Sequence, residues 1–280
     1  MKLTLVQPPA MMAVDNYSTI TQPPLSGERI TSGPMLSAGS AKKVFVVMPA
    51  YQAEHTIGSV FARLPVELQA MDCTYLVVDD GSDDRTGEVV RDLMATCGNV
   101  RLLAHERNRG YAQAQKTGFA YALANGADII ALLHADGQYA PELLPKLLAP
   151  LQNDEADLVQ GSRMLNGGAL AGGMPLYKFI ANKALTAIEN FAFGLAMGEY
   201  HSGYMLYARR TLESIPFERL SDTFHFDGEM ILMASKRRLR IKQIPIPCYY
   251  GTEKSHLRPL KYGLDVLRIV YRNATGYYEF

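Results

Sequence analysis

The chain has 280 residues, and its 28 Lys and Arg residues are balanced by 28 Asp and Glu residues, so the formal net charge is zero. A nucleic-acid-binding domain usually carries an excess of basic residues, and this balance argues against nucleic acid as a partner. The three cysteines lie far apart and without metal-binding spacing, which indicates a reducing compartment and a cytoplasmic protein. No apolar run approaches the ~18–20 residues needed to cross a bilayer, so we expect a soluble or peripheral protein.

Composition divides the chain into three parts. Residues 1–41 are rich in proline, serine and glycine and show no hydrophobic periodicity, so we expect a flexible leader there. Residues 42–257 alternate apolar runs with helical stretches, which predicts one domain with a first half at 42–163 and a second half at 164–257. Residues 258–280 carry cations at helical spacing, which predicts a cationic C-terminal helix and tail.

Short apolar runs recur along the first half of the domain, and such runs are typical of buried parallel strands. They predict strands at 44–48, 75–78, 100–103 and 129–133, with helices between them at about 55–64, 84–96 and 111–125. The second half is less regular, and we expect a strand at 157–163, a glycine-rich connection at 166–173, a helix at 176–196, a helix at 226–236 and a strand at 240–246. Strand–helix–strand spacing of roughly 25–30 residues is typical of βαβ units, so the predicted fold class is α/β, with a single doubly wound, mostly parallel sheet flanked by helices.

Acidic residues follow the second predicted strand, at the end of the sheet where ligands bind in folds of this class. The strand ends in Asp79 and Asp80, and a glycine turn then leads to Asp83 and Asp84. One or two of these acids could cap the next helix, but four exceed what a cap needs. An aspartate fixed at a strand end can accept the N–H groups of uracil or guanine, so the segment predicts recognition of a nucleotide base.

The segment from His134 to Gln138 follows the predicted strand at 129–133. An aspartate here would repel a bound diphosphate unless a divalent cation lay between them, and Mg²⁺ or Mn²⁺ prefers carboxylate and phosphate oxygens. Positions 134 and 136 project to the same side of an extended chain, so His134 and Asp136 could bind one ion, with Gln138 as a third ligand. The alternative is a plain turn after a buried strand.

Together, five segments resemble glycosyltransferase family two, whose members have the GT-A fold, and among them the branch of dolichyl- or polyprenyl-phosphate mannose or glucose synthases. The segments occur in the family's order and spacing, and the resemblance extends over about residues 43–250. They are Val46–Tyr51 with Glu54, Val77–Thr86, Asn108–Gly110, His134–Gln138 and Val159–Arg163. The resemblance implies a GT-A fold with a Rossmann-like nucleotide-binding half, and an inverting transfer of a hexose from a UDP- or GDP-sugar.

The resemblance also implies roles for single residues. Asp136 matches the metal-binding aspartate of the family's DxD motif, and Gln138 matches a glutamine of the metal shell in the mannose synthase branch. His134 stands in place of the first aspartate of that motif, and an imidazole ligand would favour Mn²⁺ over Mg²⁺. Arg163 would contact the diphosphate. The implied nucleotide-sugar-binding residues are Pro49, Tyr51, Glu54, Asp79 or Asp80, Asn108, Gly110, Ala135 and Asp136.

The acceptor side is expected in the second half of the domain. Transfer to a hydroxyl needs a general base, for which Asp227 is the first candidate and Glu229 the second. Alternatively, both acids belong to the first turn of the helix at 226–236, where negative charge favours the helix dipole. A phosphate acceptor is already anionic and needs no base. We expect a polyprenyl phosphate acceptor, with a sugar or small-molecule hydroxyl as the alternative.

The C-terminal segment predicts an amphipathic helix, which either docks on the domain or lies on a membrane surface. The second arrangement would place the protein at the inner face of the membrane, and the sequence is also compatible with a homo-oligomer. The apolar residues at helical spacing are Leu260, Leu264, Leu267 and Tyr271, and the cations are Lys261, Arg268 and Arg272.

Two other classes of protein share part of this pattern. The histidine at position 134 leaves a non-catalytic nucleotide-sugar-binding protein as an alternative. A dinucleotide-binding oxidoreductase has the same βαβ units, but no GxGxxG follows the first predicted strand, which disfavours that class.

Overall fold

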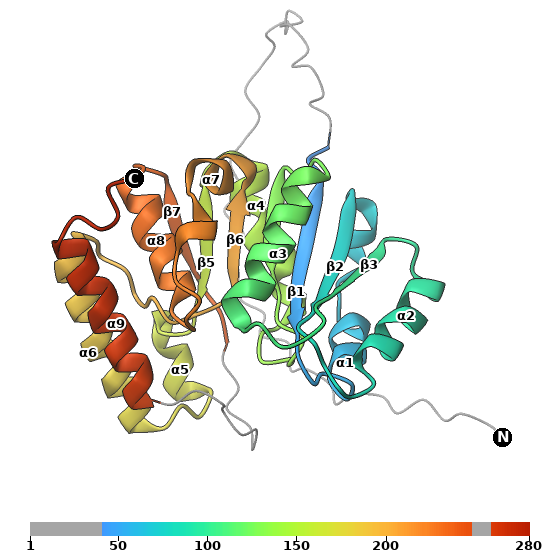
Figure 1. The fold of residues 1–280 in the computed structure, drawn as a ribbon, viewed down its shortest axis with the longest axis horizontal. Helices are drawn as coiled ribbons and strands as arrows, with labels where there is room; N and C mark the ends of the chain where they lie inside the picture. Colours follow the sequence, from blue (N-terminus) through green and yellow to red (C-terminus); the bar gives the residue numbers. More distant parts are fainter. Residues whose placement is uncertain (1–40, 248–258) are drawn as a thin grey trace, which may run out of the picture. The chain divides into compact units, whose positions relative to one another are not determined.

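The computed structural model describes residues 41–247 and 259–280, and these form a seven-stranded sheet flanked by helices (Figure 1). The strands are β1 (Val44–Ala50), β2 (Cys73–Asp79), β3 (Val100–Ala104), β4 (Ile129–Leu132), β5 (Leu158–Ser162), β6 (Met205–Ala208) and β7 (Ile241–Pro245). Their order across the sheet is β3-β2-β1-β4-β6-β5-β7. Strand β6 runs antiparallel to β4 and β5, and the other neighbouring pairs are parallel. The predicted α/β fold with a mostly parallel sheet is therefore confirmed.

The helices largely follow the predicted ranges. They are α1 (Ile57–Ala62), α2 (Thr86–Thr96), α3 (Tyr111–Ala124), α4 (Leu144–Gln152), α5 (Gly168–Ala171), α6 (Leu176–Phe193), α7 (Arg209–Ser214), α8 (Phe226–Lys236) and α9 (Pro259–Ala274). Short 3₁₀ segments are η1 (Val66–Ala70), η2 (Pro141–Leu143), η3 (Leu165–Gly167) and η4 (Phe217–Arg219).

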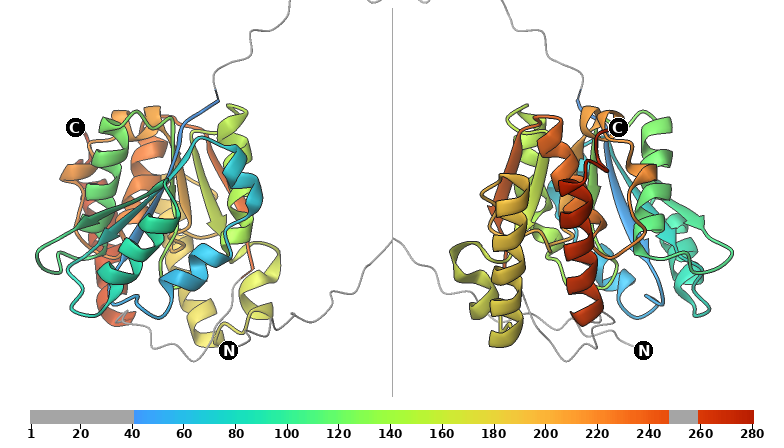
Figure 2. Two further views of the ribbon diagram at one scale, coloured as in Figure 1. Left: turned by 90° about the vertical axis from the view of Figure 1, so that its right-hand side faces the viewer. Right: turned by 60° about the vertical axis from the view of Figure 1, so that its left-hand side comes forward.

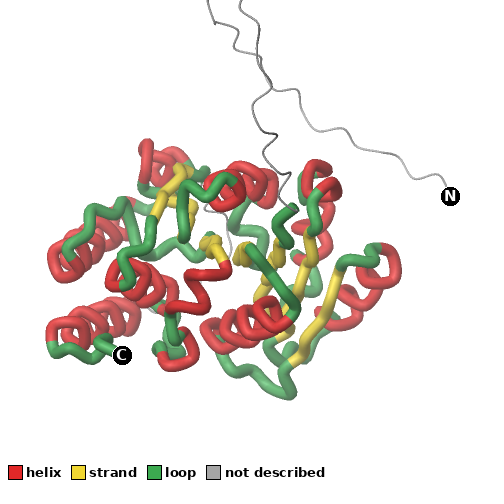
Figure 3. Tube along the Cα trace, turned by 90° about the horizontal axis from the view of Figure 1, so that it is seen from above, coloured by secondary structure: helices red, strands yellow, loops and turns green. Residues whose placement is uncertain are grey.

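Alternate residues of β1 face opposite sides of the sheet, and so they enter two separate cores. Val44, Val46 and Met48 pack with apolar residues of α1, α2 and α4. Phe45 and Val47 pack with residues of α3, α7 and α8 on the other face. Figures 2 and 3 show these helices as layers on both sides of the strands. Burial of each such side chain contributes roughly 1.5–3 kcal/mol, so a continuous apolar strand is stabilised only between two helical layers.

Several elements differ from the expectations, and α7, for example, was not predicted. The glycine-rich stretch at 166–173, expected as an open connection, contains η3 and the short helix α5. Helix α4 was not predicted, because Pro145 and Pro150 obscure its pattern. Pro145 lies in the first turn, where the missing N–H is not needed, and the helix buries its leucines against the sheet.

Helix α9 docks on the domain through Val266 and Ile269, which are buried, while Leu264, Leu267 and Tyr271 face outward. It lies beside α6, as the right-hand view of Figure 2 shows. The predicted docking of this helix on the domain is therefore present. The buried face of the helix, however, is not the one that contains the predicted apolar residues Leu264, Leu267 and Tyr271.

Within residues 41–247 and 259–280, no helix is both long enough and apolar enough to cross a membrane. The predicted leader at 1–41 lies almost wholly outside the described residues, and so does the side chain of Leu260. The division of the domain into halves at 42–163 and 164–257, with a separate tail at 258–280, stays a prediction.

Candidate active site

The carboxyl ends of β1, β2 and β4 meet at one edge of the sheet, the lower edge in Figure 1. The register places Asp79 of β2 beside Ala50 of β1, and Leu132 of β4 beside Val47. The segments that follow these strands therefore approach one another, as the topology of the fold requires. The predicted base-binding and metal-binding segments both lie at this edge.

Asp80 is buried and organises the loop after β3. Its carboxylate accepts hydrogen bonds from the backbone N–H groups of Arg109 (2.9 Å) and Gly110 (2.8 Å), and from Nδ1 of His105 (2.7 Å). Both carboxylate oxygens thus have protein partners. Asp80 therefore holds the Asn108–Gly110 loop, and these contacts favour a structural role for it.

Asp79 has fewer partners than its neighbour. Its Oδ1 accepts a hydrogen bond from the backbone N–H of Ser82 (3.0 Å), and within the described part of the chain no hydrogen bond reaches Oδ2. The turn between them needs Gly81, which has φ +70° and packs so closely on the backbone of Arg107 that a Cβ would overlap it. One carboxylate oxygen of Asp79 is therefore left for a ligand.

The remaining acids of this region hold the loop after β1 against the start of α2. Asp84 accepts hydrogen bonds from Thr86 and from the backbone N–H of Glu54, while Asp83 accepts one from the side chain of Gln52. Glu54 itself accepts a hydrogen bond from the backbone N–H of Arg85 (3.0 Å). The surplus of acids at 79–84 is therefore explained mainly by loop structure.

The segment from His134 to Gln138 forms a turn beyond the end of β4. Asp136 Oδ1 accepts the backbone N–H of Gln138 (3.0 Å), and Gly137 has φ +75°. The expected alternation of an extended strand therefore does not apply here, because the strand ends at Leu132. Ala135 is buried, His134 and Asp136 are half-buried, and Gln138 is exposed. The turn and a metal site are compatible, since the turn occupies only one oxygen of Asp136.

Tyr111, the first residue of α3, connects His134, a predicted metal ligand, to Asp227 in the second half of the domain. Its hydroxyl donates to Asp227 Oδ2 (2.9 Å) and lies 2.8 Å from His134 Nε2. A hydroxyl has one proton, so with Asp227 ionised the Nε2–H of His134 must be the donor in the second bond. In this tautomer Nδ1 of His134 carries a lone pair, and this atom has no hydrogen bond to any described residue. Gly203 packs on the same contact, and a Cβ there would lie 2.5 Å from the Tyr111 hydroxyl and 2.8 Å from Nε2.

The two acids predicted for the acceptor side have different surroundings. Asp227 is buried, and burial raises its pKa to about 6, although the hydrogen bond from Tyr111 opposes this shift. Its Oδ1 has no hydrogen-bond partner among the described residues. Glu229 is fully buried and accepts hydrogen bonds from Ser221 and from the hydroxyl of Tyr278. The contacts of Glu229 favour a structural role, so Asp227 is the better candidate for chemistry.

Arg163 follows β5 and is held by a buried carboxylate. Its guanidinium lies 2.8 Å from Glu199 and donates to the backbone carbonyl of His201 (2.6 Å). Burial lowers the pKa of His134, with the positive charge of Arg163 acting in the same direction and the charge of Asp136 opposing it. The guanidinium is therefore close enough to the turn after β4 to influence it.

The sequence matches the model of the family described as Glycosyl transferase family 2 over residues 45–215. The chain belongs to this family. It is 30% identical to a UDP-N-acetylglucosamine–dolichyl-phosphate N-acetylglucosaminyltransferase of Methanococcus voltae in an alignment of 246 residues that covers 82% of this chain and 94% of that one. It is 29% identical to an undecaprenyl-phosphate mannosyltransferase of Micrococcus luteus over 205 residues, or 73% and 82% of the two chains. These names agree with the predicted polyprenyl-phosphate branch of the family.

A solved structure shows the same fold at lower sequence identity. The glucosyl-3-phosphoglycerate synthase of Mycobacterium tuberculosis, in complex with Mn²⁺, UDP and glucosyl-3-phosphoglycerate, superposes with a TM-score of 0.57 and 21% identity. The match covers 83% of this chain and 78% of that one. The GT-A fold predicted for this family 2 glycosyltransferase is thus confirmed.

Several residues of this glycosyltransferase were missed from the sequence. Tyr111 was read only as part of a helix, although it bonds to Asp227, 116 positions away. His105 and Glu199 were not assigned the contacts they make with Asp80 and Arg163. No local spacing signals any of these pairs, because each is formed by packing of separate elements.

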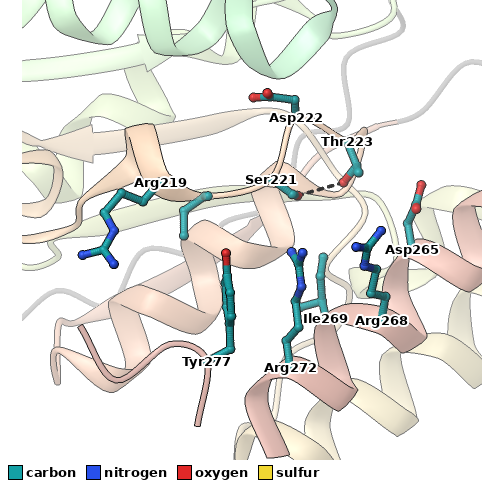
Figure 4. A pocket seen from close by; sticks show the side chains of 10 residues that line it. Arg219, Ser221, Asp222, Thr223, Asp265, Arg268, Ile269, Arg272 and Tyr277 are labelled. Carbon is teal, nitrogen blue, oxygen red and sulfur yellow. Dashed lines mark hydrogen bonds between the residues drawn. The ribbon is translucent and has the colours of Figure 1, made fainter. Parts of the chain in front are cut away.

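A cavity of about 300 Å³ lies elsewhere in the enzyme, between the segment at 219–223 and α9 (Figure 4). Arg268 and Arg272 of α9 point toward Ser221 and Thr223 across this cavity. None of the predicted donor-site residues lines it. The cavity therefore lies apart from the predicted nucleotide-sugar site.

Proposed function

We propose that this family 2 glycosyltransferase moves a hexose from a UDP- or GDP-sugar to a polyprenyl phosphate, with inversion at the anomeric carbon. The observation that carries the proposal is the alignment, over 73–82% of the chain, with relatives named for transfer to dolichyl and undecaprenyl phosphates. The open oxygens of Asp79, after β2, and of Asp136, after β4, lie at the same edge of the sheet on either side of β1 and give the donor a binding edge.

In this proposal the donor binds along the carboxyl ends of β1, β2 and β4. Asp79 accepts an N–H of the base through Oδ2, since its other oxygen is used within the turn. Tyr51, which is 49% exposed, and Pro49 and Glu54 border the nucleoside. Asn108, Gly110 and Ala135 complete the donor site, and Asp80 supports it by holding the loop that contains Asn108.

The turn after β4 has a donor set that suits a divalent cation. It offers one carboxylate oxygen of Asp136, the exposed amide of Gln138 and the Nδ1 lone pair of His134. This mixture of oxygen and nitrogen fits Mn²⁺ better than Mg²⁺, although carboxylate and amide alone would accept either ion. A cation bound there would neutralise the diphosphate as it leaves, and Arg163 would add positive charge on the same side.

The chemistry is a displacement at the anomeric carbon of the sugar. A phosphate oxygen of the acceptor forms a bond to that carbon, the bond to the diphosphate oxygen breaks, and a nucleoside diphosphate leaves. The acceptor phosphate is already anionic, so no proton has to be removed. Asp227 then acts by holding the Tyr111 hydroxyl, and through it the ring of His134.

Helices α6 and α9 offer a surface for a lipid acceptor. Phe191 is 93% exposed, and Ile180, Leu264 and Tyr271 are each more than half exposed. Lys261 and Arg268 are exposed on α9 as well. Apolar side chains accompanied by cations favour contact with an anionic membrane surface. We infer that the enzyme works as a peripheral protein at the cytoplasmic face of a membrane.

The second candidate is transfer to a sugar or small-molecule hydroxyl. It is favoured by one observation, the raised pKa of Asp227 to about 6 together with its unbonded Oδ1, which would suit a general base at neutral pH. The Asp227→Asn variant separates the two functions. Transfer to a polyprenyl phosphate should largely survive this change, whereas transfer to a hydroxyl should be lost while donor binding persists.

The donor half is tested by the thermal unfolding of the whole chain in the presence of UDP, GDP and their sugars, with and without Mn²⁺. We expect one nucleotide to raise the Tm in an Mn²⁺-dependent manner, because a ligand that binds only the folded state stabilises it. The Asp136→Ala variant should lose the Mn²⁺ dependence. If no nucleotide stabilises the protein, the proposed function is wrong. If nucleotides bind but the wild-type enzyme neither transfers nor hydrolyses the donor, the chain is a nucleotide-sugar-binding protein.

A further inference from the structure

Three side chains of the acceptor half form a cluster that the donor site does not use. Glu189 of α6, His201 of the segment before β6 and His225 at the start of α8 bring one ligand atom each to within 4.8 Å of one another. Glu189 and His225 are buried, and the side chain of His201 is only 7% exposed. The sequence separations give no metal-binding motif, so packing alone assembles the cluster.

Tyr262 of α9 fixes the orientation of both rings. Its hydroxyl lies 2.8 Å from Nδ1 of His201 and 2.9 Å from Nδ1 of His225. These contacts direct both Nε2 atoms toward Glu189. A hydrogen bond on the far nitrogen is the usual way in which proteins orient a histidine that binds a metal.

The carboxylate satisfies the ring of His225 but not that of His201. Glu189 Oε1 lies 2.6 Å from His225 Nε2, which is a hydrogen bond. Glu189 Oε2 and His201 Nε2 lie 3.4 Å apart, and both are buried without a hydrogen-bond partner in the described structure. A buried polar atom without a hydrogen-bond partner destabilises the folded state, so a ligand bound between these two atoms would stabilise it.

A divalent cation explains the separation. Two ligands of a tetrahedral Zn²⁺ ion at bond lengths of about 2.0–2.1 Å lie about 3.3–3.4 Å from each other. Burial also lowers the pKa of His201 well below its ordinary value, so the ring is neutral, as a ligand must be. Two imidazoles and one carboxylate are a ligand set that Zn²⁺ uses with a fourth position open.

We propose that Glu189, His201 and His225 bind a divalent transition-metal ion of the Zn²⁺ type, separate from the ion expected at Asp136. The ion would join α6, the segment before β6 and α8, and through Tyr262 it would hold α9 in place. His201 also accepts the hydrogen bond from Arg163 through its carbonyl, and His225 lies two positions before Asp227. The bound ion would therefore hold these elements of the second half of the domain in fixed positions relative to one another.

The probe is Co²⁺, which replaces Zn²⁺ and absorbs visible light strongly when its ligands are tetrahedral. It is added to the full chain carrying Asp136→Asn, so that the donor-site ion is weakened. We expect about one Co²⁺ per chain, displaced by Zn²⁺, and an absorption typical of four or five ligands. X-ray absorption of this sample should show imidazole nitrogens, and it requires no change within the cluster.

Two variants and a control assign the ion to its ligands. Glu189→Gln and His201→Gln, each combined with Asp136→Asn, should reduce bound Co²⁺ at least tenfold, while circular dichroism shows a folded chain. His55→Gln removes an exposed histidine outside the cluster and should leave Co²⁺ bound. Absence of Co²⁺ binding by the folded Asp136→Asn chain would overturn the proposal, as would binding without imidazole or binding retained when Glu189 and His201 are both replaced. These measurements use neither donor nor acceptor, so they are independent of the proposed transfer.

Discussion

The two halves of the sheet build their sites in different ways. In the first half, β1, β2 and β4 are parallel, and each strand delivers a contiguous segment of site residues to the same edge. In the second half, the antiparallel strand β6 lies between β4 and β5, and α6, α8 and α9 contribute single residues to clusters. The predicted donor site on strand ends is therefore encoded locally, whereas the predicted acceptor side depends on how distant elements pack.

The same contrast exists between neighbouring residues within the donor half. Asp79 and Asp80 are adjacent in sequence, yet one keeps an oxygen for a ligand and the other holds a loop. The difference comes from the ring of His105 and the backbone N–H groups of residues 109–110, which bond to the carboxylate of Asp80, whereas His105 reaches Asp79 through a bond between backbone atoms. Even a contiguous motif thus divides its functions according to tertiary contacts.

The largest effect is expected at the turn after β4. Asp136→Ala should reduce kcat by about 10²–10³, because the leaving diphosphate loses its main charge stabilisation. The free energy of unfolding should change little, since within residues 41–247 and 259–280 the Asp136 side chain makes one hydrogen bond, to the backbone of Gln138. Replacement of the exposed Asp92 by alanine is the control. Transfer assays at saturating Mn²⁺ measure kcat for both variants. An unchanged kcat for Asp136→Ala would show that Asp136 does not stabilise the leaving diphosphate.

The next effect is a pH dependence of stability that comes from Asp227, the residue of α8 that bonds to Tyr111 of α3. Burial raises the pKa of Asp227 from 3.8 to about 6, so the folded chain keeps a proton that the unfolded chain loses. The free energy of unfolding should therefore fall as the pH rises from about 4 to about 6, by up to about 3 kcal/mol from this residue. The Asp227→Asn variant should lack that part of the fall in the free energy of unfolding, and it should be more stable than the wild-type protein at pH 7.

Urea unfolding at several pH values measures this effect, with the exposed Asp92→Asn as the matched variant. The comparison rests on the difference between the two variants, because other acids also titrate in this range. Parallel stability curves for the two variants would show that Asp227 is not a buried carboxylate of raised pKa.

A third pair of variants compares the adjacent aspartates. Asp80→Asn should lower the free energy of unfolding by about 1–3 kcal/mol, because the amide N–H₂ that replaces one carboxylate oxygen would face a backbone donor, that of Arg109 or that of Gly110. Asp79→Asn should leave stability nearly unchanged and raise the KM for the donor roughly tenfold, the effect of one lost hydrogen bond. Thermal unfolding and donor titration distinguish them. A reversed pattern would assign the base to Asp80.

The smallest effect is expected for Gly203→Ala. A Cβ at this position would lie 2.5 Å from the Tyr111 hydroxyl and 2.8 Å from His134 Nε2, so it should separate them. We expect kcat to fall roughly tenfold, as for the loss of one hydrogen bond in a site. Gly58→Ala in α1 is the control, since nothing lies within 4 Å of a Cβ there. Equal activity of the two variants would show that the Tyr111–His134 contact has no role in transfer.

The sequence was sufficient for the elements whose signal is local. Continuous apolar runs located the strands, and the acids after β2 and the turn after β4 were found because each is contiguous. The antiparallel placement of β6 was not predictable, since pairing depends on the whole sheet. The contact of Tyr111 with Asp227 and the cluster at Glu189 join residues far apart in the chain, and no periodicity or spacing records them.

The most direct test is transfer itself. The wild-type enzyme is incubated with Mn²⁺, a labelled UDP- or GDP-hexose and vesicles containing a polyprenyl phosphate, and the products are extracted into organic solvent. We expect a labelled glycolipid, with release of one nucleoside diphosphate per hexose and no product from the Asp136→Ala variant. A label that stays in the aqueous phase, or that appears only on a soluble sugar hydroxyl, would contradict polyprenyl phosphate as the acceptor.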